Sequence, residues 1–297
     1  MATLPNPLPR LTADPSGRTL GLDLPPGRLV DATIDGPWHE PLLWHAEDGP
    51  APGDWAALSP ARNSGLLPVL LDVGDLRGDL SGWCLAPDRM SYAGDHDAEE
   101  VLAEFWEEKA EYGPDAEEEH PGEEEADEIY GRGPTIAEML APYGPLWPGL
   151  AAAAPLDADP DACAAETADS LAQPGSRLKR LGLERLRLAL VPARRSADIP
   201  AVIGWSAPTN HEGDVARLCA VLRSWEDRFG IRVVALADDQ LVLSVAAPPA
   251  TAAEAEAIAA EHFAFCPDTI GQGDHDTLRE YAEHEVLNGR VWSFWWD

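Results

Sequence analysis

The residues near the C-terminus best suited to chemistry are His262, Cys266 and Asp268. On a helix, His262 and Cys266 are four positions apart and share one face. A Cys–His pair can serve as a nucleophile and its base, or as two metal ligands. The thiol lies in the apolar segment Phe263-Ala-Phe-Cys-Pro267, however, and such surroundings raise a thiol pKa. We therefore interpret Cys266 as a structural cysteine and His262 as a core histidine, with a cleft position for His262 as the alternative.

Two further groups combine polar side chains at positions where ligands often bind. Trp205 precedes Asn210, His211 and Glu212, and loops at the carboxyl ends of strands often carry ligands. The capping-box spacing from Thr209 to Glu212 explains the glutamate without a functional role. The other group could hold a hard or borderline cation, although a solvated helix face explains its glutamates equally well. It comprises Asp274, His275, Asp276, Glu280, Glu283 and His284.

The common catalytic motifs are missing from the sequence. It contains no G-x-x-x-x-G-K-[ST], G-x-G-x-x-G, H-E-x-x-H or G-x-S-x-G segment. We therefore assign no catalytic residue, and we expect no cofactor and no metal ion. Two functions stay open: an interaction protein without catalysis, which we prefer, and a hydrolase or metal-dependent enzyme that uses His262, Asp268, His275 and His211.

The charge of the chain favours the interaction protein. The 297 residues include 53 acids and 21 bases, which gives a net charge of −32. Binding to nucleic acid needs clustered Lys and Arg, so this balance argues against it, and it also argues against anionic membranes. We expect a basic protein as the partner, which would make the chain an immunity-type antidote or a regulator. The oligomeric state stays open.

Half of the excess charge lies in one segment, residues 95–128, which carries 17 acids and a single base. Its first part fits a helix from Ala98 to Tyr112. Repulsion between like charges and the scarcity of apolar side chains predict that Gly113 to Asp127 is mobile. The segment reads as a solvated insertion or as an acidic docking surface for the basic partner. The docking residues would be Glu117, Glu118, Glu119, Glu123, Glu124 and Glu125.

The sequence divides into three parts. Residues 1–160 hold 21 of the 28 prolines, so we expect residues 1–150 to be a loop-rich mixed α/β region. Its clearest strand runs from Gly65 to Asp72, and its tryptophans are interpreted as core anchors. Residues 151–176 read as a linker, and residues 177–297 as a C-terminal α+β domain. The basic stretch Arg177–Arg195 includes a half-buried strand with its arginines outside.

Local signals in the C-terminal domain predict the order βαββαβ, with one additional helix before the last strand. The strands are at 199–205, 231–236, 240–246 and 291–296, and the first helix runs from Val215 to Phe229 and is closed by Gly230. Thr251 caps a second helix that ends before Pro267, and Asp276 can cap a further helix to Leu287. This order is typical of a ferredoxin-like α+β sandwich. Trp292, Phe294 and Trp296 should be core residues, and the last strand should be buried on both faces.

Several segments of this domain resemble one bacterial family, the domain of unknown function 4253. They are Asp198–Trp205, Leu222–Gly230, Leu243–Pro249, Glu261–Asp268 and Trp292–Asp297. The resemblance covers about the last hundred residues. It supports the domain boundary and implies no activity.

The N-terminus has no basic region followed by an apolar run, and no stretch approaches the roughly 18 apolar residues that span a bilayer. The four cysteines, Cys84, Cys163, Cys219 and Cys266, form no C-x-x-C pair. Their wide spacing suits neither a disulfide scaffold nor a zinc knuckle. We expect a cytoplasmic protein with reduced thiols.

Overall fold

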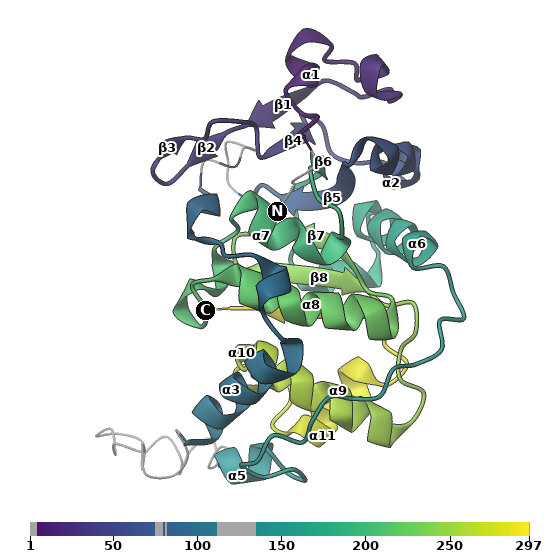
Figure 1. Cartoon of the computed structure of the whole chain (residues 1–297). Helices are drawn as coiled ribbons and strands as arrows, with labels where there is room; N and C mark the ends of the chain where they lie inside the picture. Colours follow the sequence, from purple (N-terminus) through teal and green to yellow (C-terminus); the bar gives the residue numbers. More distant parts are fainter. Residues whose placement is uncertain (1–4, 75–79, 81, 112–134, 297) are drawn as a thin grey trace, which may run out of the picture.

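The computed structural model describes residues 5–74, 80, 82–111 and 135–296. It is a mixed α/β structure built on one seven-stranded sheet (Figure 1), whose strand order is β1-β4-β6-β5-β7-β8-β9. The strands are β1 (Gly27–Val30), β4 (Leu43–Ala46), β5 (Leu67–Asp72), β6 (Leu186–Val191), β7 (Arg232–Leu236), β8 (Gln240–Ser244) and β9 (Val291–Trp295). A separate small hairpin pairs β2 (Ala32–Thr33) with β3 (Gly36–Pro37).

Strands from the two halves of the chain are interleaved at the centre of this sheet. β5, from the first quarter of the sequence, lies between β6 and β7. It is parallel to β7, and every other pair of neighbouring strands is antiparallel. The predicted division at residues 150 and 176 therefore separates strands that pair within one sheet.

Helices cover both faces of the sheet. The larger core, on one face, receives α3 (Ala98–Glu111), α7 (Ile199–Ile203), α8 (Val215–Phe229) and α9 (Ala252–Phe265). The smaller core, on the other face, receives α1 (Arg10–Ala13), α2 (Asp54–Ala57) and α6 (Pro160–Ala172). The remaining short helices are α5 (Ile136–Met139), α10 (Asp268–Gly271) and α11 (Leu278–Tyr281). A π-helical turn, Ala282–Val286, continues α11. The 3₁₀ turns are Arg18–Leu20, Ser59–Ser64, Pro87–Arg89, Ala93–Asp95, Arg177–Leu181, Ser196–Asp198 and Ala207–Asn210.

Several local predictions are confirmed. Helix α8 runs from Val215 to Phe229 and ends at Gly230, whose φ of 62° is the left-handed conformation expected of a stop. The capping box of Thr251 and Glu254 opens α9 with both of its hydrogen bonds. The β7–β8 hairpin and strand β5 also lie where the sequence predicts them. Trp292, Phe294 and Trp296 are buried.

The predicted strand at 199–205 is wrong, because this segment forms helix α7. Pro200 stands in its first turn, where a proline costs no hydrogen bond, and Gly204 ends it with a φ of 68°. The predicted cap at Thr209 is also wrong. Asp214 caps α8 instead, accepting a hydrogen bond from the amide of Ala216.

The ferredoxin-like arrangement is not found. That fold needs parallel strands on either side of its first helix, as in any βαβ unit. Here β6 is antiparallel to β5 while β7 is parallel to it, so β6 and β7 run in opposite directions. What the structure shows is the coarser class, helices around a large mixed sheet.

Three smaller predictions also need correction. The predicted linker contains α6, thirteen residues long, whose Ala164, Ala168 and Leu171 are buried in the smaller core. Strand β6 is buried on both faces from Leu188 onward, rather than on one, because Ala189 and Val191 pack in the larger core and Leu188 and Leu190 in the smaller core. In β9, Trp295 is only partly buried, because this strand lies at the edge of the sheet.

Candidate functional site

His262 lies in the core of the protein. Its ring packs between Trp225, Trp292 and Phe294 at centroid distances of 5.1, 4.5 and 4.9 Å. Its Nδ1 is 3.0 Å from the hydroxyl of Tyr281, and within the described residues Nε2 has no hydrogen-bond partner. Burial lowers the pKa of His262 to about 3, so the ring is neutral near pH 7. The interpretation as a core histidine is therefore favoured over the cleft position.

Cys266 is buried at the end of α9. Burial raises the pKa of its thiol to about 12. The thiol donates a hydrogen bond to the carbonyl of Trp295 at 2.9 Å and accepts one from the Thr269 hydroxyl at 3.1 Å. Asp268 begins the short helix α10, and the amide of Gln272 donates to its carboxylate at 3.4 Å. These contacts hold α10 against β9 and suit a structural cysteine.

Glu261, beside His262, is a buried carboxylate that the sequence analysis did not single out. Arg228 binds both of its oxygens, at 2.7 and 2.6 Å. The indole of Trp225 and the amide of Ala151 each donate to it at 2.7 Å. All these donors satisfy the charge, so Glu261 anchors residue 151 to the C-terminal helices.

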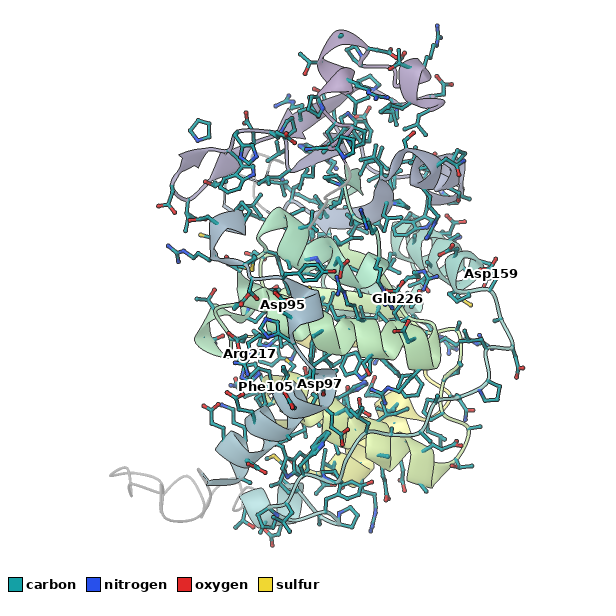
Figure 2. The ribbon with its side chains drawn as sticks, viewed as in Figure 1. Asp95, Asp97, Phe105, Asp159, Arg217 and Glu226 are labelled. Atoms are coloured by element: carbon teal, nitrogen blue, oxygen red, sulfur yellow. The ribbon has the colours of Figure 1, made fainter. Side chains whose placement is uncertain are left out.

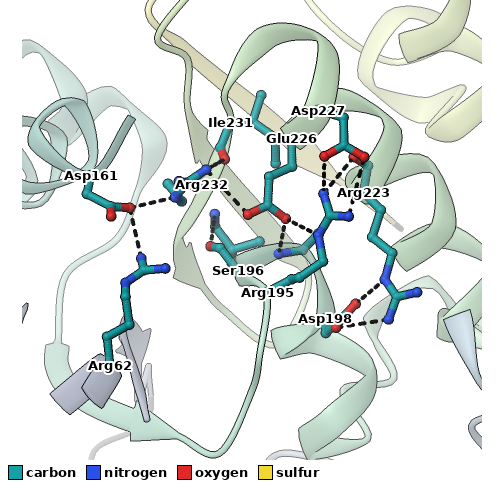
Figure 3. Close-up of polar contacts among 12 residues, drawn as sticks. Arg62, Asp161, Arg195, Ser196, Asp198, Arg223, Glu226, Asp227, Ile231 and Arg232 are labelled. Carbon is teal, nitrogen blue, oxygen red and sulfur yellow. Dashed lines mark hydrogen bonds and ion pairs between the residues drawn. The ribbon is translucent and has the colours of Figure 1, made fainter. Parts of the chain in front are cut away.

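A second polar network lies across α8 (Figure 3). Glu226 joins Arg195 at 3.0 Å and Arg232 at 3.3 Å. Asp161 of α6 joins Arg232 at 2.7 Å and Arg62 at 2.9 Å. The network ties segments from both cores together and consists of paired charges, so we assign it a structural role.

The group after Trp205 is also occupied by structural contacts. Glu212 pairs with Arg217 at 2.6 Å, and Arg217 lies over the ring of Phe105, 5.1 Å from its centroid (Figure 2). His211 packs on the same ring at 4.7 Å. Burial, helped by the charge of Lys109, lowers the pKa of His211 to about 4. Asn210 ends the 3₁₀ turn before them.

The structure does not bring the predicted histidines to one pocket. His275 lines an open cleft whose lining does not include His262, although both rings pack near Tyr281, at 6.3 and 5.9 Å. The Nε2 of His275 is 3.4 Å from Glu285, and its ring stacks on His284 at 5.2 Å. No group of three His, Cys, Asp or Glu side chains among the described residues could hold a metal ion. The six glutamates of the predicted docking surface, Glu117–Glu119 and Glu123–Glu125, lie outside the described residues.

The most suggestive hollow, here called the tryptophan–aspartate cleft, opens where the parallel strands β5 and β7 end. It encloses about 540 Å³. In open α/β sheets, ligands bind outside the carboxyl ends of such strands. Two partly exposed indoles, Trp83 and Trp295, and three carboxylates line it. None of its described lining residues is basic: Asp72, Val73, Gly74, Gly82, Trp83, Leu181, Gly182, Leu183, Ala237, Asp238, Asp239, Gln240 and Trp295.

The wall of the cleft formed by Asp72 is held by hydrogen bonds to backbone amides. Asp72, which ends β5, accepts hydrogen bonds from the amides of Gly74, Glu184 and Arg185 at 3.0, 2.9 and 3.0 Å. The carboxylate of Asp72 is therefore committed to shaping the cleft.

The remaining two aspartates form the β7–β8 turn. The amide of Ala237 donates to Gln240 at 2.8 Å, and the amide of Trp296 donates to the carbonyl of Asp239 at 3.0 Å. The indole of Trp205 donates to the carbonyl of Ala237 at 2.7 Å. Trp205, a predicted site residue, thus lies beneath the turn that presents Asp238 and Asp239.

The electrostatics of this turn favour a positive ligand. Asp238 and Asp239 are both exposed. Partial burial, followed by the negative charges of Asp238 and Asp72, raises the pKa of Asp239. A cation placed between these carboxylates would relieve that repulsion. Tryptophan faces bind cations best among aromatic rings, so the indoles and the aspartates favour the same class of ligand.

Sequence reasoning missed most of this cleft. It interpreted Asp238-Asp239 only as a turn, Trp83 as a core anchor and Trp295 as buried. The available signal was a pair of acids in a tight hairpin, but nothing local shows that the distant Trp83 and Trp295 meet that turn.

A second cleft of about 340 Å³ lies next to the first and shares Leu181, Gln240 and Trp295 with it. It follows the outer edge of β9 and includes His275, Tyr281 and Glu285. The two clefts together follow the end and the edge of the sheet.

Comparison with known proteins confirms the resemblance at the C-terminus. Residues 187–297 match the model of a family described as a domain of unknown function (DUF4253). A comparison with curated proteins gave no match, and neither did a comparison with solved structures. Among the described residues, no helix is long and apolar enough to cross a membrane.

Proposed function

We propose that this chain is a non-enzymatic cytoplasmic interaction protein, such as an immunity-type antidote or a regulator, that binds a basic protein. The tryptophan–aspartate cleft is its contact site and takes a lysine or arginine side chain of the partner. One observation carries the proposal: two partly exposed indoles and two exposed aspartates line one cleft with no base among its described residues.

The physical argument combines two attractions. A cation over an indole face gains about 0.5–1 kcal/mol at exposed sites, and more as the pair is desolvated. Charge-assisted hydrogen bonds to Asp238 and Asp239 add to this, because they are stronger than neutral ones. The net charge of −32 supports the same partner over longer distances by raising the rate of encounter.

In this proposal the two acidic regions have different tasks. The cleft holds a cationic side chain and slows dissociation. The glutamates at 117–119 and 123–125 attract the partner before contact and act on the association rate. Screening over about 8 Å at physiological ionic strength should therefore slow association more than it speeds dissociation.

The enzymatic alternative gains no support from the geometry. It relied on His262, Asp268, His275 and His211 acting together. His262 is enclosed by aromatic rings, His211 packs on Phe105 and only His275 faces an open cleft. We therefore do not propose it as a second function.

The test compares two charge-matched variants with wild type, using the basic peptide acetyl-Gly-Arg-Gly-amide as the probe. The cleft variant is Asp238→Asn/Asp239→Asn, and the control is Glu107→Gln/Glu108→Gln, on the exposed face of α3. We expect the peptide to shift the indole N–H resonances of Trp83 and Trp295 in wild type and control, but not in the cleft variant. Equal shifts in all three proteins would contradict the cleft as the contact site.

The second arm uses a basic protein recovered by pull-down, followed by stopped-flow kinetics. The cleft variant should dissociate faster, whereas a variant with glutamine at the six glutamates should associate more slowly at low salt. Association that is independent of salt in every variant would remove the electrostatic basis of the proposal.

A further inference from the structure

We propose that the partner binds as an extended strand, pairing with the free edge of β9 and placing a basic side chain in the tryptophan–aspartate cleft. This inference rests on the proposed function, and it adds how the partner's backbone is held. Strand addition to an exposed sheet edge is a general mode of peptide recognition, in which backbone hydrogen bonds supply affinity and pockets supply specificity.

The hydrogen-bond pattern shows which groups of β9 point outward. β9 ends the sheet, with β8 on its inner side. The amide of Trp296 donates to Asp239, and the carbonyl of Arg290 accepts from Val245, so residues 290 and 296 face β8. Residues of a strand alternate between its two edges. The amide and carbonyl groups of Val291 and Ser293 therefore face away from β8, and among the described residues no backbone partner is found for them.

Space for a strand exists beside these groups. The second cleft borders Val291 and Ser293. Its lining also includes Leu178 and Leu181 of one 3₁₀ turn, together with His275 and Tyr281. Both Val291 and Ser293 are partly exposed. At the far end, the carbonyl of Trp295 is already bonded to the Cys266 thiol. Pairing is therefore confined to residues 291–293, about 10 Å of extended chain.

The two clefts adjoin at this edge. They share Leu181, Gln240 and Trp295. A segment paired with Val291 and Ser293 reaches Trp295 within about two further residues, at roughly 3.3 Å each. Its next side chain then faces Asp238 and Asp239. None of the described lining residues of that cleft is basic and three are aspartates, so a lysine or an arginine fits there better than an acidic side chain.

Charge selects the occupant of the edge. A second copy of this chain could also pair edge to edge, but both copies would carry a net charge of −32. A basic segment is attracted instead. Its cationic side chain would compete with Arg180 for Glu285, because Arg180 and Glu285 form an ion pair at 3.1 Å and both line the second cleft. We therefore assign the edge to a basic partner and not to self-association.

The test uses a pair of variants at one position of the edge. Ser293→Pro removes the outward amide, and proline is tolerated on edge strands when its nitrogen faces away from the sheet. Ser293→Ala keeps that amide. With acetyl-(Arg-Val)₃-amide as the probe, we expect Ser293→Pro to weaken binding about tenfold or more and Ser293→Ala to change it little. Amide exchange at Val291 and Ser293 of wild type should slow when the peptide binds.

A second probe tests strand addition with the wild-type protein alone, so the result does not depend on whether Ser293→Pro folds. The same peptide, N-methylated throughout, keeps its charges but cannot donate backbone hydrogen bonds. It should bind wild type at least about tenfold more weakly than the unmodified peptide. Equal binding of the two peptides, without slowed exchange at Val291 and Ser293, would overturn strand addition.

The outcomes separate the two proposals. If Ser293→Pro binds normally while Asp238→Asn/Asp239→Asn does not, strand addition is wrong and the proposed function stands. If wild type binds neither acetyl-Gly-Arg-Gly-amide nor acetyl-(Arg-Val)₃-amide at low salt, both proposals are wrong. Exchange at Val291 and Ser293 that slows with protein concentration alone would assign the edge to a second copy and overturn the inference.

Discussion

The interior of α9 and the tryptophan–aspartate cleft use similar residue types in opposite ways. In α9, Glu261 and His262 are fully buried, and Glu261 is satisfied by Arg228, Trp225 and Ala151. In the cleft, Asp238 and Asp239 are exposed, and partial burial and neighbouring negative charges raise the pKa of Asp239. A polar group whose partners are all internal stabilises the fold, whereas one held in an open cleft by its backbone stays available to a ligand.

The largest loss of stability is expected from a substitution of Glu261. Replacing it with alanine leaves the Arg228 guanidinium in a largely buried position without its partner. Breaking a buried pair in this way costs about 3–5 kcal/mol. We expect denaturant unfolding of Glu261→Ala to show a loss of this size.

The control for Glu261 is Glu256→Gln, which breaks the ion pair with Arg279, a side chain that is 61% exposed. Exposed pairs contribute about 0–1 kcal/mol, so this variant should lose little stability. Similar losses in the two variants would show that Glu261 is no anchor.

Two tryptophans of strand β9 differ in burial in the same way. Trp292 is buried among Trp225, Phe229 and His262, and a core Trp→Ala substitution costs about 3–5 kcal/mol. Trp295 is partly exposed in both clefts, so Trp295→Ala should cost about 1–2 kcal/mol. Chemical denaturation of the two variants side by side measures the difference, and a larger loss for Trp295→Ala would assign that indole to the core.

The pH dependence of stability reports on His262. Its pKa is about 3 in the folded protein and 6.5 in the unfolded chain, so the unfolded state binds the extra proton between these values. The contribution of His262 to the free energy of unfolding is present above about pH 6.5 and is lost as the pH falls towards 3. This linkage amounts to about 2 kcal/mol between pH 7 and pH 5.

The variant His262→Phe should remove that contribution. Its unfolding free energy should fall less steeply than that of wild type from pH 7 to pH 5, a range in which most carboxylates stay ionised. His211, whose pKa is lowered to about 4, contributes in the same direction to both proteins and cancels in the difference. Identical slopes would mean that His262 binds protons equally in the folded and unfolded states, so that burial does not lower its pKa.

The smallest effect on stability is expected in the cleft. Asp238→Asn/Asp239→Asn changes exposed turn residues and removes like-charge repulsion, so the free energy of unfolding should stay within about 0.5 kcal/mol of wild type. Thermal or denaturant melts check this value. A loss above about 2 kcal/mol would place these aspartates with Glu261, as parts of the fold.

Local signals predicted the elements that depend on neighbouring residues. The apolar period of α8, its stop at Gly230 and the capping box of α9 are read within one or two turns of the chain, and all three are confirmed. The segment from 199 to 205 failed because a short apolar run fits a strand and a buried helix equally well. The apolar surroundings of Cys266 correctly indicated a buried thiol, and burial raises its pKa to about 12.

The charge, the buried residues of the last strand and the resemblance to a domain of unknown function can be read from the chain alone. The position of β5 between β6 and β7, the enclosure of His262 and the meeting of Trp83 and Trp295 with the turn at Asp238 become visible only in the folded protein. The difference arises from sequence separation. Strand order and cleft walls arise from pairings between residues far apart in the chain, and such pairings leave no periodic or capping signal in either segment.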